Sequence, residues 1–169
     1  MERSQHWVVR DGSEENMQEI LSLRRIVFGE MEKDKLDPEF WKWEFMEGPD
    51  GAARVYLVKE REMIAGHLAD LPKRFCVEGK TVIGSLTLDM MVHPDYRRRG
   101  VSAAMARYGI QKFEKEKGML MTAYSVRRAS INSLFKTGWK GVTTLPILVY
   151  PLRFEALSIV IFIFHPSAS

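Results

Sequence analysis

Hydrophobic residues recur along this chain with two different periods, and the change of period predicts its secondary structure. In four stretches apolar residues return every three or four positions, which is the spacing of one face of an amphipathic helix. We expect helices at residues 14–31, 37–47, 100–117 and 129–136. Ser13 and Asp37 precede the first two stretches and are residue types that cap helix starts.

Between these helices the pattern alternates every second residue or forms short apolar runs, both typical of strands. We expect strands at residues 6–10, 54–59, 63–71, 81–93, 119–126, 143–150 and 157–164. Regular alternation in the fourth strand predicts that Leu88, Met90 and Val92 share one face, with Asp89 and Met91 on the other.

The turns and helices between the strands predict how they pair. Polar turns at 60–62 and 77–80 join three strands into an antiparallel meander. The helix at 100–117 links the last of these strands, at 81–93, to the strand at 119–126, which predicts a parallel β-α-β unit. The predicted fold is therefore α+β, a mixed and mostly antiparallel sheet with a central β-α-β unit and flanking helices, in a single domain over residues 1–169.

Composition narrows the function classes and the compartment. The net charge of +3, from 25 basic and 22 acidic residues, is too small to indicate a nucleic-acid partner. Cys76 is the single cysteine, so we expect no internal disulfide, a small core residue there and a cytoplasmic location. The apolar run at 157–164 is shorter than the roughly 20 residues of a membrane span. We expect no membrane partner, and a last strand at 157–164 that either closes this sheet or is shared in a homodimer.

The segment after the strand at 81–93 carries the clearest chemical signal. Three arginines, Arg97, Arg98 and Arg99, lie just before Gly100 and the predicted helix start. Unpaired N–H groups and the helix dipole make such a start favourable for anions, and Gly100 and Ser102 are small enough to admit one. The P-loop and the GxGxxG fingerprint are both absent. A phosphate or pyrophosphate site is the sharper interpretation, and a solvated basic turn is the alternative.

These residues resemble the signature of the GNAT acetyltransferase superfamily, in which Arg or Gln is followed by two residues, Gly, one residue, and Gly or Ala. Arg97 and Gly100 match the pattern, with Ser102 at its last position. The resemblance implies acetyl-CoA as acyl donor, with its pyrophosphate on backbone N–H groups and its pantetheine paired with the preceding strand. The implied cofactor-binding residues are Met91, Val92, Arg97, Arg98, Arg99, Gly100, Val101, Ser102 and Ala103.

The resemblance also raises a question about proton transfer. Members of the family often carry a tyrosine in the short helix after the fifth strand, where this chain has Phe135. Phenylalanine donates no proton, so Tyr124 or Ser125, a water, or weak catalysis are the alternatives. Arg127 or Arg128 stands where the family has an asparagine, and either contacts a CoA phosphate or is solvated.

Asp89 is the predicted base, because a carboxylate on the strand that leads to the cofactor needs a partner or a role. The alternative is a strand-edge Asp bonded to a neighbour. His67 on the adjacent strand is a candidate second base or substrate contact. The four histidines and one cysteine lack metal-ligand spacing, so we expect no metal.

The predicted function is therefore acetyl transfer from acetyl-CoA to the primary amine of a small molecule, by direct attack of the amine. The aromatic-rich helix at 37–47 either borders the acceptor or packs on the sheet. Two alternatives are a peptide or protein amine as acceptor, and a catalytically weak domain that binds CoA as a sensor.

Overall fold

The computed structural model describes residues 6–125 and 127–143, and the strands within them form one mixed sheet. The strands follow chain order: β1 (Val9–Gly12), β2 (Arg54–Glu60), β3 (Met63–Val77), β4 (Lys80–Val92) and β5 (Met121–Thr122). β1 to β4 pair antiparallel and β5 pairs parallel to β4 through a helical crossover. The predicted meander, β-α-β unit and α+β class are confirmed.

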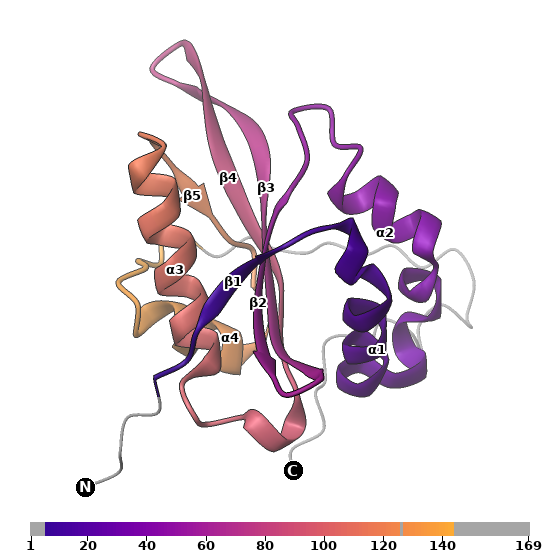
Figure 1. Cartoon of the computed structure of the whole chain (residues 1–169). Helices are drawn as coiled ribbons and strands as arrows, with labels where there is room; N and C mark the ends of the chain where they lie inside the picture. Colours follow the sequence, from indigo (N-terminus) through magenta and orange to yellow (C-terminus); the bar gives the residue numbers. More distant parts are fainter. Residues whose placement is uncertain (1–5, 126, 144–169) are drawn as a thin grey trace, which may run out of the picture. The chain divides into compact units, whose positions relative to one another are not determined.

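Helices cover both faces of this sheet, as Figure 1 shows. The α-helices are α1 (Met17–Phe28), α2 (Pro38–Phe45), α3 (Val101–Lys115) and α4 (Arg128–Phe135), and the 3₁₀ turns are η1 (Glu14–Asn16), η2 (Gly29–Leu36) and η3 (Pro94–Tyr96). α1 and α2 lie on one face, and α3 and α4 on the other. α2 starts as the sequence predicts, since the Asp37 side chain accepts a bond from the Glu39 N–H and Pro38 follows it.

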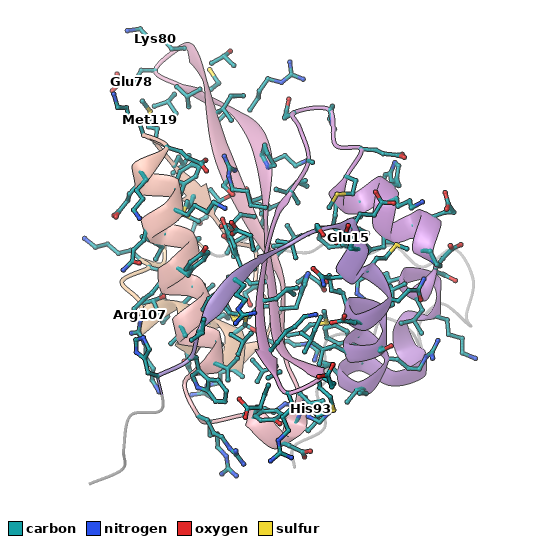
Figure 2. The ribbon with its side chains drawn as sticks, in the orientation of Figure 1. Glu15, Glu78, Lys80, His93, Arg107 and Met119 are labelled. Carbon is teal, nitrogen blue, oxygen red and sulfur yellow. The ribbon has the colours of Figure 1, made fainter. Side chains whose placement is uncertain are left out.

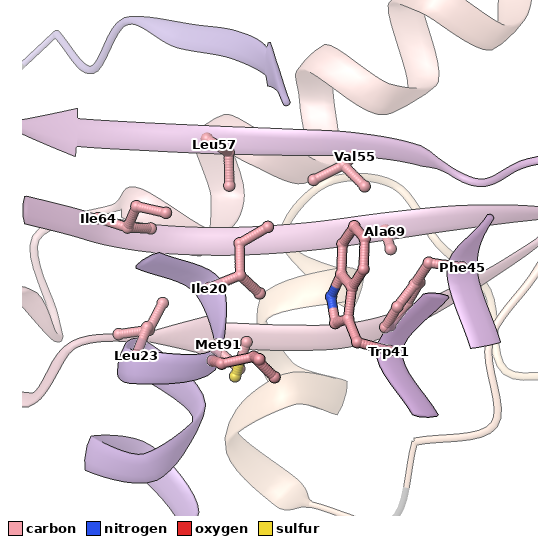
Figure 3. Close-up of a cluster of buried hydrophobic side chains, with 10 residues drawn as sticks. Ile20, Leu23, Trp41, Phe45, Val55, Leu57, Ile64, Ala69 and Met91 are labelled. Carbon is pink, nitrogen blue, oxygen red and sulfur yellow. The ribbon is translucent and has the colours of Figure 1, made fainter. Parts of the chain in front are cut away.

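Each face of the sheet has its own apolar core. Figure 3 shows the core beneath α1 and α2, where Ile20 and Trp41 lie over Leu57 and Met91. Trp41 and Phe45 are fully buried there, so the aromatic helix packs on the sheet. The second core lies under α3 and contains Val101 of that helix. α1, α2 and α3 are therefore held by burial on a common scaffold.

A β-bulge interrupts β4 at Asp89, and it overturns the predicted alternation of that strand. Two β4 residues lie opposite the single β3 residue between His67 and Ala69, and Asp89 has a φ of +54°. Because the bulge adds one residue, Leu88 packs with Met91 in the α1/α2 core, whereas Met90 and Val92 pack in the α3 core.

Two other predictions are wrong in the described residues. Cys76 is exposed instead of buried, because it lies near the tip of the long β3–β4 hairpin rather than over either core. The strand expected at 119–126 is much shorter and pairs at two positions, Met121 and Thr122.

The strands expected at 143–150 and 157–164, and any strand shared in a homodimer, lie outside the described residues. The described helices and strands belong to a compact unit that ends at Trp139, and a single domain over residues 1–169 stays a prediction. Among the described helices, none combines the length and apolar composition that crossing a bilayer requires.

Candidate active site

The arginine loop (Arg97–Gly100) leaves an open, positively charged start to α3. Gly100 caps the helix with φ +82°, and Arg98 has φ +60°. Apart from its chain neighbours, no described residue has an atom within 4 Å of the position that a Gly100 Cβ would take. The first N–H groups of α3 have no acceptor in the described part of the chain, and the three exposed arginines form no ion pair there. This arrangement fits a pyrophosphate, which needs several donors and free space.

Close packing fixes the start of α3 on the sheet. A Cβ at Gly66 of β3 would lie 2.5 Å from Cγ1 of Val101, so only glycine allows this approach. The Trp7 indole N–H donates to the carbonyl of Arg99 at 2.7 Å, and the Ser133 hydroxyl of α4 donates to Ser102 Oγ at 2.8 Å. Contacts with the sheet, the N-terminal segment and α4 therefore fix the arginine loop and the start of α3 in place.

The end of β4 next to this loop has an edge that none of the described strands pairs with. β5 pairs with β4 at Ser85 and Leu86, and no described strand pairs with that edge of β4 between Leu88 and Val92. Figure 2 shows His93 at one end of β4 and Lys80 at the other, so α3 begins beside the unpaired end. Backbone groups of an unpaired edge can bind an extended ligand as a strand would.

Asp89 accepts hydrogen bonds through both its side chain and its backbone carbonyl. Its Oδ2 accepts a bond from Arg24 Nη2 at 2.7 Å, and its carbonyl accepts one from His67 Nδ1 at 2.9 Å. The Arg24 and His67 side chains are completely or almost completely buried, and the Asp89 side chain is 10% exposed. Burial lowers the pKa of His67, against the effect of Asp89, so this histidine is neutral with its proton on Nδ1.

Glu44 of α2 is a second carboxylate in this network. Its Oε2 lies 3.4 Å from Arg24 Nη2, the same atom that binds Asp89, and its side chain is 20% exposed. Burial raises the pKa of Glu44 above its usual 4.5, and the nearby Asp89 adds to that effect while Arg24 opposes it. The polar network consists of Arg24, Glu44, His67 and Asp89.

Sequence reasoning found Asp89 and His67 but missed Arg24 and Glu44. The sequence does point to Arg24, because it lies on the apolar face of α1, one turn after Ile20 and directly after Leu23. A charged residue on such a stripe predicts a buried partner of opposite charge. Glu44 has no such signal, because its neighbours in α2 are aromatic residues that dominate the pattern.

The other predicted residues lie in the segment after β5. Tyr124 is 65% exposed, and Phe135 ends α4 and is 52% exposed. The guanidinium of Arg127 stacks over the ring of Phe28, with Cζ 4.5 Å from the ring centroid. Arg127 is exposed to solvent and at the same time contacts the end of α1.

Comparison with known proteins assigns the family. A sequence model of the acetyltransferase (GNAT) domain matches residues 8–140, which include every described helix and strand. The chain belongs to the GNAT acetyltransferase family. The residues that resemble the GNAT signature, Arg97, Gly100 and Ser102, lie within the match. No curated protein sequence matches the chain significantly.

Solved structures confirm the GNAT fold. A predicted acetyltransferase with acetyl-CoA from Clostridium acetobutylicum has a TM-score of 0.68 at 12% identity, covering 85% of this chain and 96% of that one. A transcriptional regulator from Bacillus halodurans has 0.67 at 13%, covering 86% and 100%. An aminoglycoside antibiotic 6'-N-acetyltransferase from Acinetobacter haemolyticus has 0.63 at 15%, covering 86% and 99%. At these identities the likeness shows the fold.

Proposed function

We propose that this chain transfers the acetyl group of acetyl-CoA to the primary amine of a small molecule, by direct attack of the amine on the thioester. One observation carries the proposal: within the described residues, an open, glycine-capped helix start with three arginines adjoins an unpaired strand edge. Pyrophosphate and pantetheine are joined in CoA, and these two surfaces are joined in the fold. Acetyl-CoA supplies the activated acyl group when it is bound.

The chain's own residues have distinct tasks in this proposal. Backbone N–H groups of residues 98–103 bind the pyrophosphate, and Arg97, Arg98 and Arg99 add positive charge. The β4 backbone at Met91 and Val92 orients the pantetheine beside the bulge. Tyr124 stays the predicted proton donor to the thiolate, and Asp89 the predicted proton acceptor.

Similarity in fold supports a small-molecule acceptor. Three of the similar structures are aminoglycoside acetyltransferases, one of them in complex with sisomicin. A primary amine is mostly protonated near neutral pH, so a transferase for amines needs a group that removes a proton. The carboxylates of the polar network meet that need.

A second candidate function is CoA binding with little catalysis. Phe135 favours it, because the resemblance to the family leads one to expect an acidic hydroxyl at that position. The exposed Tyr124 hydroxyl also forms no hydrogen bond in the described part of the chain. Such a protein would bind CoA tightly without amine-dependent turnover.

A thiol-release assay with acetyl-CoA separates these functions. The acceptors are sisomicin, a linear polyamine and a lysine-containing peptide, and CoA binding is measured in parallel by calorimetry. We expect CoA binding together with release that depends on sisomicin or the polyamine. Release with the peptide alone would favour the protein-amine alternative. Binding without any amine-dependent release would favour the sensor.

A pair of glycine variants tests the site itself. Gly100→Val should abolish CoA binding, because the side chain enters the open space of the arginine loop. Gly79→Val is the matched control. Gly79 has φ +74° and, apart from its chain neighbours, no described atom within 4 Å of its added Cβ, but it lies in the β3–β4 turn. Both variants incur the same kind of backbone strain. Equal CoA binding by the two variants would refute the site.

A further inference from the structure

Asp89, the predicted base, already forms a buried ion pair with Arg24. Asp89 Oδ2 lies 2.7 Å from Arg24 Nη2, which is the length of a strong charge-assisted hydrogen bond. The guanidinium therefore occupies this carboxylate oxygen, which is not free to accept a bond from an incoming amine. The side chain is also 90% buried, which restricts its access to an incoming amine.

Glu44 differs from Asp89 in both respects. Its contact with Arg24 Nη2 is longer, at 3.4 Å, and its side chain is twice as exposed, at 20% against 10%. Trp41 and Phe45 on either side of it in sequence are fully buried, so α2 holds Glu44 at a fixed place on the sheet. Glu44 is therefore positioned, partly accessible and only loosely paired.

Buried nitrogens without a partner among the described residues lie beside the network, and two of them, Arg24 Nε and Trp41 Nε1, are N–H donors that suit an oxygen atom rather than an ammonium group. Arg24 Nε, Trp41 Nε1 and His67 Nε2 are buried and have no hydrogen-bond partner among the described residues. All three side chains surround the Phe45 ring, with Arg24 Cζ at 5.7 Å and the Trp41 and His67 rings at 5.3 and 6.0 Å from its centroid. Orphaned buried polar atoms are rare and call for an explanation.

We propose that Glu44, rather than Asp89, binds the ammonium group of the acceptor and takes its proton. This inference rests on the proposed function, because it names the acceptor subsite of that reaction and selects cationic primary amines. Asp89 and Arg24 then act as positioning residues that orient Glu44. The raised pKa of Glu44, caused chiefly by burial, supports the assignment because it brings the carboxylate closer to the pH at which a base works best.

The proton and electron balance of the step is complete. Glu44 takes one proton from the ammonium, and the freed nitrogen lone pair forms an N–C bond to the thioester carbonyl carbon. The C–S bond breaks with its electron pair on sulfur, and the thiolate takes a proton from the Tyr124 hydroxyl, which is restored by the second proton that the nitrogen releases. The products are the acetamide and CoA thiol, and the proton on Glu44 passes to solvent.

Titratable groups from four elements face Glu44, and those from three of them are charged. Arg24 of α1 and Lys35 of η2 lower its pKa, whereas Asp89 of β4 raises it. His67 of β3 also faces the network and is neutral, because burial lowers its pKa. Glu44 must be ionised to act, so kcat/KM for the amine should rise as pH increases through its pKa.

Glu44→Gln tests the assignment, with Glu47→Gln as the matched control. Both changes replace a carboxylate by its amide, and Glu47 is exposed just beyond α2. The reaction uses acetyl-CoA with sisomicin, or the primary amine of the acceptor panel that turns over fastest. We expect Glu44→Gln to lower kcat/KM for the amine about a hundredfold or more. The wild-type pH profile of kcat/KM should show two ionisations, a lower one of Glu44 and an upper one of the amine. Glu44→Gln should remove the lower one. The Kd for CoA should stay within about twofold, which also reports correct folding, and Glu47→Gln should match wild type.

Three results would overturn the inference, and they are distinguishable. Retention of both kcat/KM and the lower ionisation in Glu44→Gln excludes Glu44. Loss of that ionisation in Asp89→Asn, with Glu44→Gln unaffected, returns the proton-acceptor role to Asp89. No amine-dependent thiol release by wild type overturns the proposed function itself, and this inference with it.

Discussion

The buried pair between Arg24 and Asp89 should be among the most costly contacts to break in this protein. Arg24→Met removes the guanidinium but keeps an unbranched side chain of similar length, so the cavity that remains is small. It leaves the Asp89 carboxylate, 10% exposed, without its 2.7 Å partner. Removing one member of a buried pair costs about 3–5 kcal/mol of unfolding free energy. We expect a loss near 3 kcal/mol, because Asp89 keeps some contact with solvent.

Asp89→Asn completes the double-mutant cycle. Asparagine tolerates the φ of +54° that the bulge imposes, so the change removes charge without adding backbone strain. Arg24 keeps Glu44 as a counter-ion at 3.4 Å, and we therefore expect a smaller loss of about 2 kcal/mol. The double variant has neither the unpaired Asp89 carboxylate nor the unpaired guanidinium, and only Glu44 has lost its counter-ion, so its cost should fall below the sum of the singles by about 1–3 kcal/mol.

Urea unfolding of wild type, the two single variants and the double variant measures these losses of unfolding free energy. Equal m-values would show that the transitions are comparable, and a repeat at 1 M NaCl should leave the coupling nearly unchanged because buried pairs are weakly screened. Single costs that add within about 0.5 kcal/mol would refute the pairing of Arg24 with Asp89.

Three further outcomes follow from packing, burial and charge. Gly66→Ala places a Cβ 2.5 Å from Val101 and should lower the unfolding free energy by about 1–3 kcal/mol and weaken CoA binding. Gly12→Ala, whose Cβ would lie 2.8 Å from Val55 of β2, should lower stability without changing the Kd for CoA. Equal Kd values for the two variants would contradict the coupling of β3 to α3. Burial raises the pKa of Asp70, so the folded protein loses stability as pH rises through that pKa. Asp70→Asn should therefore be more stable than wild type at pH 7, by on the order of 1 kcal/mol, but not at pH 4. Urea unfolding at both pH values checks this, and a variant less stable than wild type at pH 7 would contradict it. CoA binding measured by calorimetry should weaken steadily between about 0.05 and 0.5 M NaCl, because exposed arginines attract the phosphates; salt-independent binding would count against the arginine loop.

Local signals predicted the parts of this fold that local chemistry determines. Asp37 with Pro38 starts α2, and the turns at 60–62 and 77–80 form the hairpins. The arginine loop was also predictable, since a strand end, a glycine and a helix start are all visible in neighbouring residues. Helix and strand ends moved by a few residues because packing decides where each element stops.

Features that depend on distant contacts were not predictable. The apolar run Met90–Val92 after Asp89 breaks the alternation of β4 but does not locate a bulge. The strand bulges at Asp89, where Arg24, 65 residues away, and His67 bind its side chain and backbone. Cys76 was assigned to the core on residue type, and the length of the β3–β4 hairpin places it outside. Glu44 belongs to the polar network through Arg24 alone, a pairing that no spacing rule anticipates.

The central claim, an acyl-CoA site at the start of α3, is tested most directly by an amide NMR titration with CoA. Backbone N–H groups that bind a phosphate shift strongly, so the largest changes should fall on residues 98–103, with smaller ones at Met91 and Val92 of β4. Gly79 in the β3–β4 turn should stay unchanged. Saturating shifts confined to another surface, or none at millimolar CoA, would contradict the account.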